Sequence, residues 1–308
     1  PPGRGRGGGL TMRIGSAPIT WGICEIPGWG PQKPWPEVLD EMAAAGFAGT
    51  ELGPAGYLPM DPGVLREELA RRKLAMIAAF VPVNFRQREA HAASFKAVDE
   101  VARLLAALGA RDILLSDEGD EMRKSIAGRT SETAVRGMTA EEWKAFVDGL
   151  HQAADRCRDL GLTVSFHPHG GTYIEHPAEV QRLLESTDPD RIRLCLDTGH
   201  TAFGGGDPLE TVRRWGSRIG LVHLKDIDMD RLRAGIAQGK GYTPLAQEGV
   251  FVELGTGSLD LRAILGELKA AGYDGWLVVE QDRVVQPGED TLAVAVRNRR
   301  YLRETFGL

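Results

Sequence analysis

The segment HPHGGTYIEH at residues 167–176 holds three of the chain's seven histidines and a glutamate, directly after an apolar run. Imidazole and carboxylate groups bind divalent metals and transfer protons near neutral pH. Similar residues follow other apolar runs, as DTGH at 197–200, HLKD at 223–226 and EQD at 280–282. Buried charges that converge on one site need a cation or each other. The sequence therefore predicts a metal site, provided that the fold brings these segments together.

Four segments share one pattern that indicates how they are positioned. In each, a helical pattern stops at a glycine, and the apolar run that follows ends in an acid or a histidine. Glycine just past a helix supplies the left-handed residue that ends it. The segments are EMAAAGFAGTELG (41–53), LAALGARDILLSD (105–117), CRDLGLTVSFHPH (157–169) and LKAAGYDGWLVVEQD (268–282). Their repetition predicts βαβ units and a parallel sheet.

The rest of the chain extends this pattern to eight strands. The expected strands are 14–21, 49–52, 74–81, 112–117, 163–168, 192–198, 220–225 and 275–281. Eight strands that alternate with helices over 308 residues predict an α/β fold, a single (β/α)₈ TIM barrel. The alternative fold, a doubly wound open sheet, is less favoured because this chain has no G-x-G-x-x-G after its first strand. We expect one catalytic domain over 13–308 and a disordered leader or extension over 1–12.

Composition excludes several classes of function. A formal charge of −6 argues against a nucleic-acid partner, because a phosphate backbone needs a basic face. No apolar run approaches the roughly 20 residues that span a bilayer, so no membrane role is expected. Three widely spaced cysteines favour a reducing, cytoplasmic compartment over a disulfide framework.

The active site of such a barrel lies at the C-terminal ends of its strands. Candidate residues there are Trp21, Glu51, Asp117, His167, His169, Asp197, His200, His223, Lys225, Asp226, Glu280 and Asp282. A single carboxylate after a strand is usually a helix cap, but four adjacent strands that all end this way indicate a shared site. Two connections, 118–139 and 226–257, exceed ordinary loop lengths and are interpreted as covers of the site.

The combination of CLDTGH (195–200), HLKD (223–226), GTGSLD (255–260) and VVEQD (278–282) resembles the xylose-isomerase-like TIM-barrel superfamily. The resemblance covers nearly all of 13–290. Within that superfamily, IGSAPITWG (14–22), DEMAAAGFAGTELGPAGYLP (40–59) and HPHGGTYIE (167–175) look most like inosose dehydratases. The resemblance implies a small polyol or keto-sugar substrate, and self-association is common among these proteins.

The resemblance also implies a set of metal ligands. The superfamily usually supplies Glu, Asp, His and Glu from strands five to eight, and Asp197, His223 and Glu280 match three of them. Where an epimerase of the group has Glu-Asn-His, this chain has His-Pro-His at 167–169. The resemblance suggests that Glu175 supplies the missing carboxylate, with His167 or His169 as the alternative. Such ligands favour Mn²⁺ or Co²⁺, with Mg²⁺ and Zn²⁺ as alternatives.

The implied reaction is dehydration of a keto-inositol by removal of an α-proton and loss of water. Glu280 or His169 is the expected base, and His200 or His167 the expected acid. Lys225 is expected to hydrogen-bond the developing oxyanion.

The remaining candidates are expected to contact substrate. They are Trp21, Glu51, Asp226 and Asp282, although Glu51 also suits a helix cap and Trp21 a plug of the barrel. The alternative reactions are isomerisation or epimerisation of a keto-sugar and elimination from a 3-keto-glycoside.

Overall fold

A computed structural model describes residues 12–130 and 137–308 of the chain, so the leader proposed for 1–12 lies almost wholly outside the described residues. Nine strand segments form one parallel sheet in the order β3-β2-β1-β11-β8-β7-β6-β5-β4. The segments are β1 (Arg13–Ser16), β2 (Gly49–Thr50), β3 (Ala75–Met76), β4 (Phe80–Val83), β5 (Asp112–Asp117), β6 (Thr163–Phe166), β7 (Ile192–Asp197), β8 (Ile219–Leu224) and β11 (Trp276–Val279).

The sheet closes through the short bend between β3 and β4. Ala78 O accepts a hydrogen bond from Leu52 N at 3.0 Å, and Ala79 O accepts one from Leu114 N at 2.9 Å. This one segment therefore bonds to the neighbours on both of its sides, and together with β3 and β4 it fills a single position in the barrel. The prediction of a single (β/α)₈ barrel is confirmed, although the strand expected at 74–81 is divided in two.

The first strand ends earlier than the expected 14–21. A 3₁₀ turn (Pro18–Trp21) follows β1, and proline occupies the first position of that turn. Proline fixes its own backbone angle and has no N–H to donate to a neighbouring strand. The extended chain therefore stops at Ser16, and Trp21 lies on the turn instead of at a strand end.

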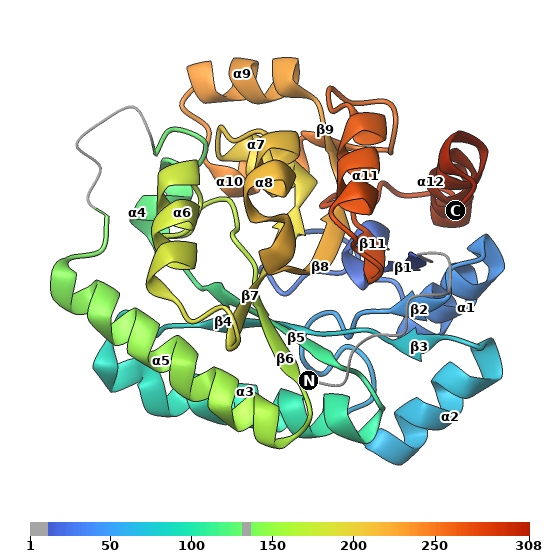
Figure 1. Cartoon of the computed structure of the whole chain (residues 1–308). Coiled ribbons are helices and arrows are strands. Elements are labelled where there is room, and N and C mark those ends of the chain that lie inside the picture. Colours follow the sequence, from blue (N-terminus) through green and yellow to red (C-terminus); the bar gives the residue numbers. More distant parts are fainter. Residues whose placement is uncertain (1–11, 131–136) are drawn as a thin grey trace.

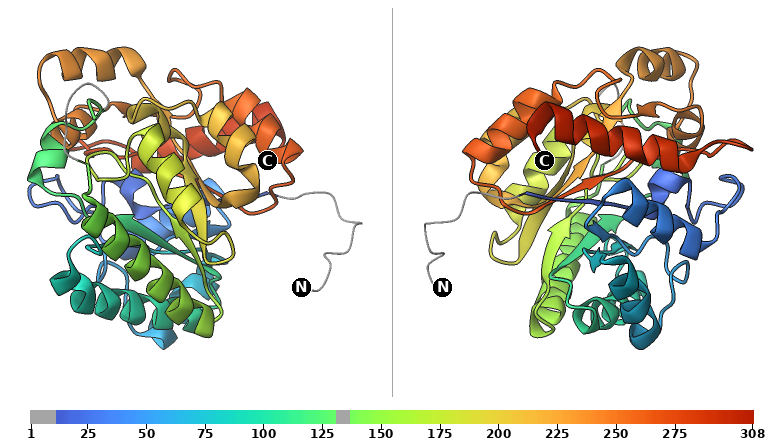
Figure 2. Two further views of the ribbon diagram at one scale, coloured as in Figure 1. Left: turned by 60° about the vertical axis from the view of Figure 1, so that its left-hand side comes forward. Right: turned by 90° about the vertical axis from the view of Figure 1, so that its right-hand side faces the viewer.

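Helices surround the sheet (Figure 1), and α1 packs against α12 (Figure 2). The longer helices are α1 (Trp35–Ala45), α2 (Pro62–Arg72), α3 (His91–Ala107), α5 (Ala140–Asp159), α6 (Pro177–Ser186), α8 (Pro208–Trp215), α9 (Met229–Ala237), α11 (Leu261–Ala270) and α12 (Thr291–Phe306). Short helices are α4 (Glu121–Ser125), α7 (Thr198–Phe203) and α10 (Tyr242–Gln247), with 3₁₀ turns at Arg88–Ala90 and Gly216–Arg218. A small antiparallel pair, β9 (Asp226–Ile227) and β10 (Phe251–Val252), lies outside the barrel sheet.

Local capping explains where these helices begin and end. The Thr139 hydroxyl accepts from Glu142 N, and the Glu142 carboxylate accepts from Thr139 N at 2.7 Å, which forms the capping box at the start of α5. Asp207 Oδ1 accepts from Leu209 N at the start of α8. Gly46, with φ of 87°, ends α1 in the left-handed conformation that glycine tolerates best.

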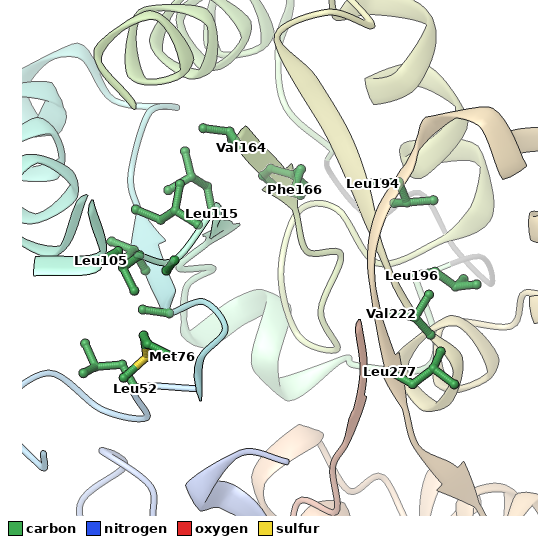
Figure 3. Close-up of a cluster of buried hydrophobic side chains, with 14 of the residues drawn as sticks. Leu52, Met76, Leu105, Leu115, Val164, Phe166, Leu194, Leu196, Val222 and Leu277 are labelled. Atoms are coloured by element: carbon green, nitrogen blue, oxygen red, sulfur yellow. The ribbon is translucent and has the colours of Figure 1, made fainter. Parts of the chain in front are cut away.

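Two apolar clusters on opposite faces of the sheet set the direction of each strand's side chains. One cluster lies between sheet and helices (Figure 3). Its strand residues include Leu115, Val164, Phe166, Leu194, Leu196, Val222, Leu224 and Leu277. The other fills the barrel interior with residues such as Leu114, Cys195, Leu221, Trp276 and Val278. Since side chains alternate along a strand, residues two positions beyond the interior ones also face the interior.

No helix within the described part of the chain is long and apolar enough to cross a membrane. All three cysteines, Cys24, Cys157 and Cys195, are free thiols. Burial raises the pKa of Cys195 to about 11, which keeps this thiol protonated beneath the site.

Candidate active site

The alternation of the strands brings four metal-ligating side chains together at the C-terminal end of the barrel. Asp197 lies two residues beyond the interior Cys195, His223 two beyond Leu221, and Glu280 two beyond Val278. His167 follows β6 in the same way, because Val164 and Phe166 face the helices. One ligand atom from each of the four lies within 4.8 Å of the others, and no residue of the set is more than 7% exposed.

The distances among these four residues, here called the ligand cluster, fit a single divalent cation. His223 Nδ1 lies 3.1 Å from His167 Nε2, 3.1 Å from Glu280 Oε2 and 3.6 Å from Asp197 Oδ2. His167 Nε2 lies 3.4 Å from Asp197 Oδ2. Four ligands at about 2.0–2.1 Å from a tetrahedral cation are separated by roughly 3.4 Å. Asp197 Oδ2 is buried and, apart from its ion pair with Lys225 Nζ at 3.1 Å, accepts no hydrogen bond from the described residues.

Glu175 does not join the ligand cluster, which corrects the expectation from the sequence. Its Oε1 accepts hydrogen bonds from Gly128 N at 2.8 Å and Thr130 Oγ1 at 3.2 Å, and its Oε2 accepts one from Gly171 N. The carboxylate thus joins two loops above the barrel. Burial raises the pKa of Glu175 to about 7. His167, the alternative that the sequence left open, stands with Asp197, His223 and Glu280.

A second group of side chains adjoins the ligand cluster. His169, His200 and Asp282 offer atoms within 4.8 Å of one another, and the rings of His169 and His200 lie 3.9 Å apart. Lys225 connects the two groups. Its Nζ lies 2.8 Å from Asp282 Oδ1 and 3.1 Å from each of His200 Nε2, Asp197 Oδ2 and Glu280 Oε2. The ammonium already compensates the charge of the second group.

The electrostatics of the site indicate one permanently charged cation, Lys225, and two neutral imidazoles, His167 and His169. Burial alone would lower the pKa of Lys225, but Asp197, Asp282 and Glu280 raise it well above its usual value. Burial lowers the pKa of His167 to about 4. Burial and the neighbouring His200 hold the pKa of His169 well below its usual value. Both imidazoles are therefore neutral near pH 7, the form in which imidazole binds metals or accepts protons.

Comparison with known proteins places this barrel in a family. Residues 39–305 match the family model described as xylose isomerase-like TIM barrel. The chain belongs to this family. The resemblance read from the sequence is thereby confirmed over nearly the whole barrel.

Named relatives and solved structures of the family extend the comparison. An inosose dehydratase of Geobacillus kaustophilus is 34% identical over 272 residues, covering 88% of each chain. The rhizopine catabolism protein MocC of Rhizobium meliloti is 36% identical over 286 residues, covering 92% of this chain and 85% of that protein. The solved structure of the IOLI protein with a binding zinc atom has a TM-score of 0.72 at 17% identity, covering 96% of this chain and all of that one. At that identity the likeness supports the fold alone.

Two residues of this xylose isomerase-like barrel that were expected to contact substrate lie elsewhere. Trp21 is 1% exposed among core side chains between sheet and helices, and its Nε1 donates to Glu41 Oε2 at 2.7 Å. The carboxylate of Asp226 is taken up by backbone N–H groups. Oδ2 accepts from Gly255 and Gly257, and Oδ1 accepts from Leu259 and from Ile227. Asp226 thus shapes the GTGSLD loop instead of facing the site.

Two other candidates have partners that the sequence did not reveal. Glu51 Oε1 lies 2.8 Å from His223 Nε2, on the side of that ring away from the ligand cluster. The Asp117 carboxylate accepts from Gly119 N and Tyr173 N and pairs with Arg86, so it ties loops together. Neither residue joins the ligand cluster or the group around Lys225.

Tyr242 is a site residue that sequence reasoning missed. It begins α10, in the connection 226–257 that was interpreted as a cover, and Figure 1 shows α9 and α10 beside α7. Its hydroxyl donates to Asp282 Oδ2 at 2.6 Å and lies 3.4 Å from His169 Nε2. The unusual length of the connection was the only signal, because a tyrosine within it has no distinctive pattern.

Proposed function

We propose that the protein is a metal-dependent dehydratase that removes an α-proton and then water from a keto-inositol. The observation that carries this proposal is the ligand cluster at the barrel mouth of a chain whose named relatives include several inosose dehydratases. A second such relative, from Geobacillus thermodenitrificans, is 33% identical over 306 residues and spans 96% of this chain. Similarity over the whole barrel supports a shared reaction better than a shared motif would.

The residues that would hold the metal are His167, Asp197, His223 and Glu280. When bound, such a cation supplies Lewis acidity, which polarises a ketone oxygen and stabilises negative charge there. Two imidazoles with two carboxylates form a softer set than the three carboxylates expected with Glu175. This set favours Mn²⁺, Co²⁺ or Zn²⁺ over Mg²⁺.

The hydrogen bonds of His169 and His200 suit them to opposite proton transfers. His169 Nδ1 lies 2.9 Å from Gly170 O, so Nδ1 carries the proton and Nε2 presents a lone pair. His200 Nδ1 lies 3.4 Å from Gly170 N, and we assign the proton of that ring to Nε2, which lies 3.3 Å from Asp282 Oδ2 and 3.1 Å from Lys225 Nζ. His169 Nε2 is thus the base that takes the α-proton. His200 Nε2–H is the acid that protonates the departing hydroxyl.

These two transfers balance over one turnover. The α-carbon loses a proton to His169, a carbon–carbon double bond forms, and the β-carbon–oxygen bond breaks as His200 gives its Nε2 proton to the leaving oxygen. The proton that His169 has gained passes to His200, whose ring lies 3.9 Å away, so His169 is not left as a cation nor His200 as an anion. Water is released. The ammonium of Lys225, adjacent to Glu280 and Asp282, offsets negative charge that develops on the carbonyl oxygen. The two imidazoles lie close enough for the proton to return before the next cycle.

Residue 167 also bears on the alternative reaction. Epimerases of the superfamily use a glutamate on each face of the substrate, and the resemblance places one of these at strand five. Here that position is His167, a neutral imidazole within the ligand cluster, so one face lacks its carboxylate base. This favours a reaction with one base and one acid over a two-base epimerisation.

The first test is mass spectrometry of reactions in D₂O. Protein loaded with Mn²⁺ would be mixed with keto-inositols, keto-sugars and 3-keto-glycosides. We expect a product lighter by one water from a keto-inositol only. Deuterium uptake without loss of water would replace the proposal with an isomerase or epimerase, and release of an aglycone would replace it with a glycoside lyase. No change in any substrate would contradict the proposed reaction.

The assignment of the fourth ligand is tested by a pair of substitutions. His167→Ala is expected to weaken Mn²⁺ binding by more than about 100-fold, because even outer partners of a ligand are worth 10–100-fold. Glu175→Gln should leave Mn²⁺ affinity within about twofold of wild type. It should lower the free energy of unfolding by about 1–3 kcal/mol, since an amide cannot accept every N–H that the carboxylate accepts.

Titration of both variants with Mn²⁺ and urea unfolding provide the two measurements. Each variant is the control for the other, since the two residues flank the same loop. Weak binding by Glu175→Gln together with normal binding by His167→Ala would reverse the assignment.

A further inference from the structure

Glu51 and His223 form a contact across the barrel that the proposed reaction does not use. Glu51 directly follows β2, His223 lies in β8, and 172 residues separate them in the chain. The distance from Glu51 Oε1 to His223 Nε2 is 2.8 Å, and both side chains are at most 3% exposed. The contact therefore forms only when the first and second halves of the barrel are assembled.

The two nitrogens of the His223 ring face opposite environments. Nδ1 faces the ligand cluster, 3.1 Å from His167 Nε2 and 3.1 Å from Glu280 Oε2. Nε2 faces Glu51 Oε1 at 2.8 Å. A ring nitrogen binds a metal only through an unprotonated lone pair, so a neutral His223 must keep its proton on Nε2. A carboxylate accepts that proton in a hydrogen bond but cannot donate one in return.

The carboxylate of Glu51 makes a single hydrogen bond within the described part of the chain. His223 is the sole hydrogen-bond partner there for its side-chain oxygens. A buried carboxylate with one partner is costly, so we infer that this contact serves the site. The alternatives raised by the sequence do not account for it, because no helix begins within ten residues and Glu51 faces the ring edge directed away from the ligand cluster.

We propose that Glu51 is a positioning residue for the metal centre. It holds the proton of His223 on Nε2 and fixes the ring plane, so that the Nδ1 lone pair points at the position shared by His167, Asp197 and Glu280. The inference rests on the metal centre of the proposed function and adds an outer partner to it. Outer partners of metal-bound histidines are commonly carboxylates.

The test compares Co²⁺ affinity in wild type, Glu51→Ala and Glu51→Gln by competition with a chelator of known affinity. Loss of an outer partner typically weakens metal binding 10- to 100-fold, which is the range expected for Glu51→Ala. Glu51→Gln retains an oxygen that accepts the Nε2–H but loses the charge. We expect it to bind about 3- to 10-fold more weakly than wild type, since charged acceptors form hydrogen bonds roughly twice as strong.

Two further readouts separate positioning from a general structural effect. In the Zn²⁺-loaded wild type, a ¹H–¹⁵N spectrum should contain a slowly exchanging Nε2–H of His223, and this signal should exchange fast in Glu51→Ala. Glu41→Gln is the matched control. Glu41 is a partly buried carboxylate that accepts hydrogen bonds from Trp21, Lys33 and Thr291. It does not contact His223, so the Glu41→Gln variant should bind Co²⁺ as tightly as wild type.

The outcomes distinguish the inference from the proposed function. If wild type itself binds no Co²⁺, the metal centre fails and the role of Glu51 fails with it. If wild type binds Co²⁺ and Glu51→Ala binds within twofold of it, the metal centre stands and the role of Glu51 is overturned. Should Glu51→Ala not fold, a normal Co²⁺ affinity and an unchanged Nε2–H signal in Glu51→Gln would equally overturn it.

Discussion

Replacement of Asp197 by alanine is expected to abolish both metal binding and turnover. Asp197 Oδ2 lies 3.4 and 3.6 Å from the two imidazoles of the ligand cluster, and a neutral methyl group cannot replace it. Lewis-acid stabilisation is worth several kilocalories per mole, and about 4 kcal/mol corresponds to roughly 10³-fold in rate. We therefore expect kcat/KM to fall by about 10³-fold or more.

Elemental analysis of purified protein and steady-state kinetics measure the two effects. The second oxygen of Asp197 accepts from His200 N at 2.7 Å and caps α7, so loss of the cap must be separated from loss of the ligand. Asp207→Ala is the matched control, because Asp207 caps the neighbouring α8 from an exposed position. That variant should lose about 1 kcal/mol of stability and no metal. Full metal content in Asp197→Ala would remove Asp197 from the ligand cluster.

Replacement of Lys225 by methionine is expected to reduce kcat by about 10²- to 10³-fold, the usual cost of losing one donor to a developing oxyanion. Metal affinity should not fall, because the substitution removes a positive charge 3.1 Å from two of the proposed ligands. A fall in kcat without a fall in metal affinity distinguishes loss of a catalytic group from collapse of the site.

Stability of the same variant provides an independent check. Removing one partner of a buried ion pair typically costs about 3–5 kcal/mol, and Lys225 is 1% exposed among three carboxylates. We expect a lower Tm without metal and partial recovery when Mn²⁺ neutralises Asp197 and Glu280. Lys240→Met, which breaks a more exposed pair with Glu248, should change neither kcat nor the response to Mn²⁺. A kcat within threefold of wild type in Lys225→Met would exclude the lysine from the chemistry.

The parts of the site that the sequence predicted are those that local rules determine. The glycine after each helix and the apolar run behind it identify a strand. Alternation along that strand then decides which side chain reaches the barrel mouth. This rule predicts that Asp197, His223 and Glu280 lie at the barrel mouth, while their role as metal ligands came from the family resemblance; His200 and Lys225 lie in the same segments. Each lies within two or three residues of a strand end.

The residues that were misassigned depend on contacts between distant segments. Glu175 looked like a ligand until the path of two loops brought the N–H groups of Gly128 and Gly171 to its carboxylate. The carboxylate of Asp226 accepts hydrogen bonds from backbone N–H groups of a loop some thirty residues further along the chain. The partner of Glu51 lies 172 residues away. Neither periodicity nor spacing within one segment contains this information.

The pairing of β1 with β11 has a consequence for how the chain folds. Ile14 pairs with Leu277, and the Ser16 hydroxyl donates to Val279 O across 263 residues of sequence. At a ribosomal rate of 5–20 residues per second, β1 waits roughly 13 to 53 s for this partner to be synthesised. Contacts so distant in sequence slow folding and leave an open apolar edge for that time. Glu280 follows the same late strand, so a nascent chain acquires its complete set of metal ligands only as the barrel closes.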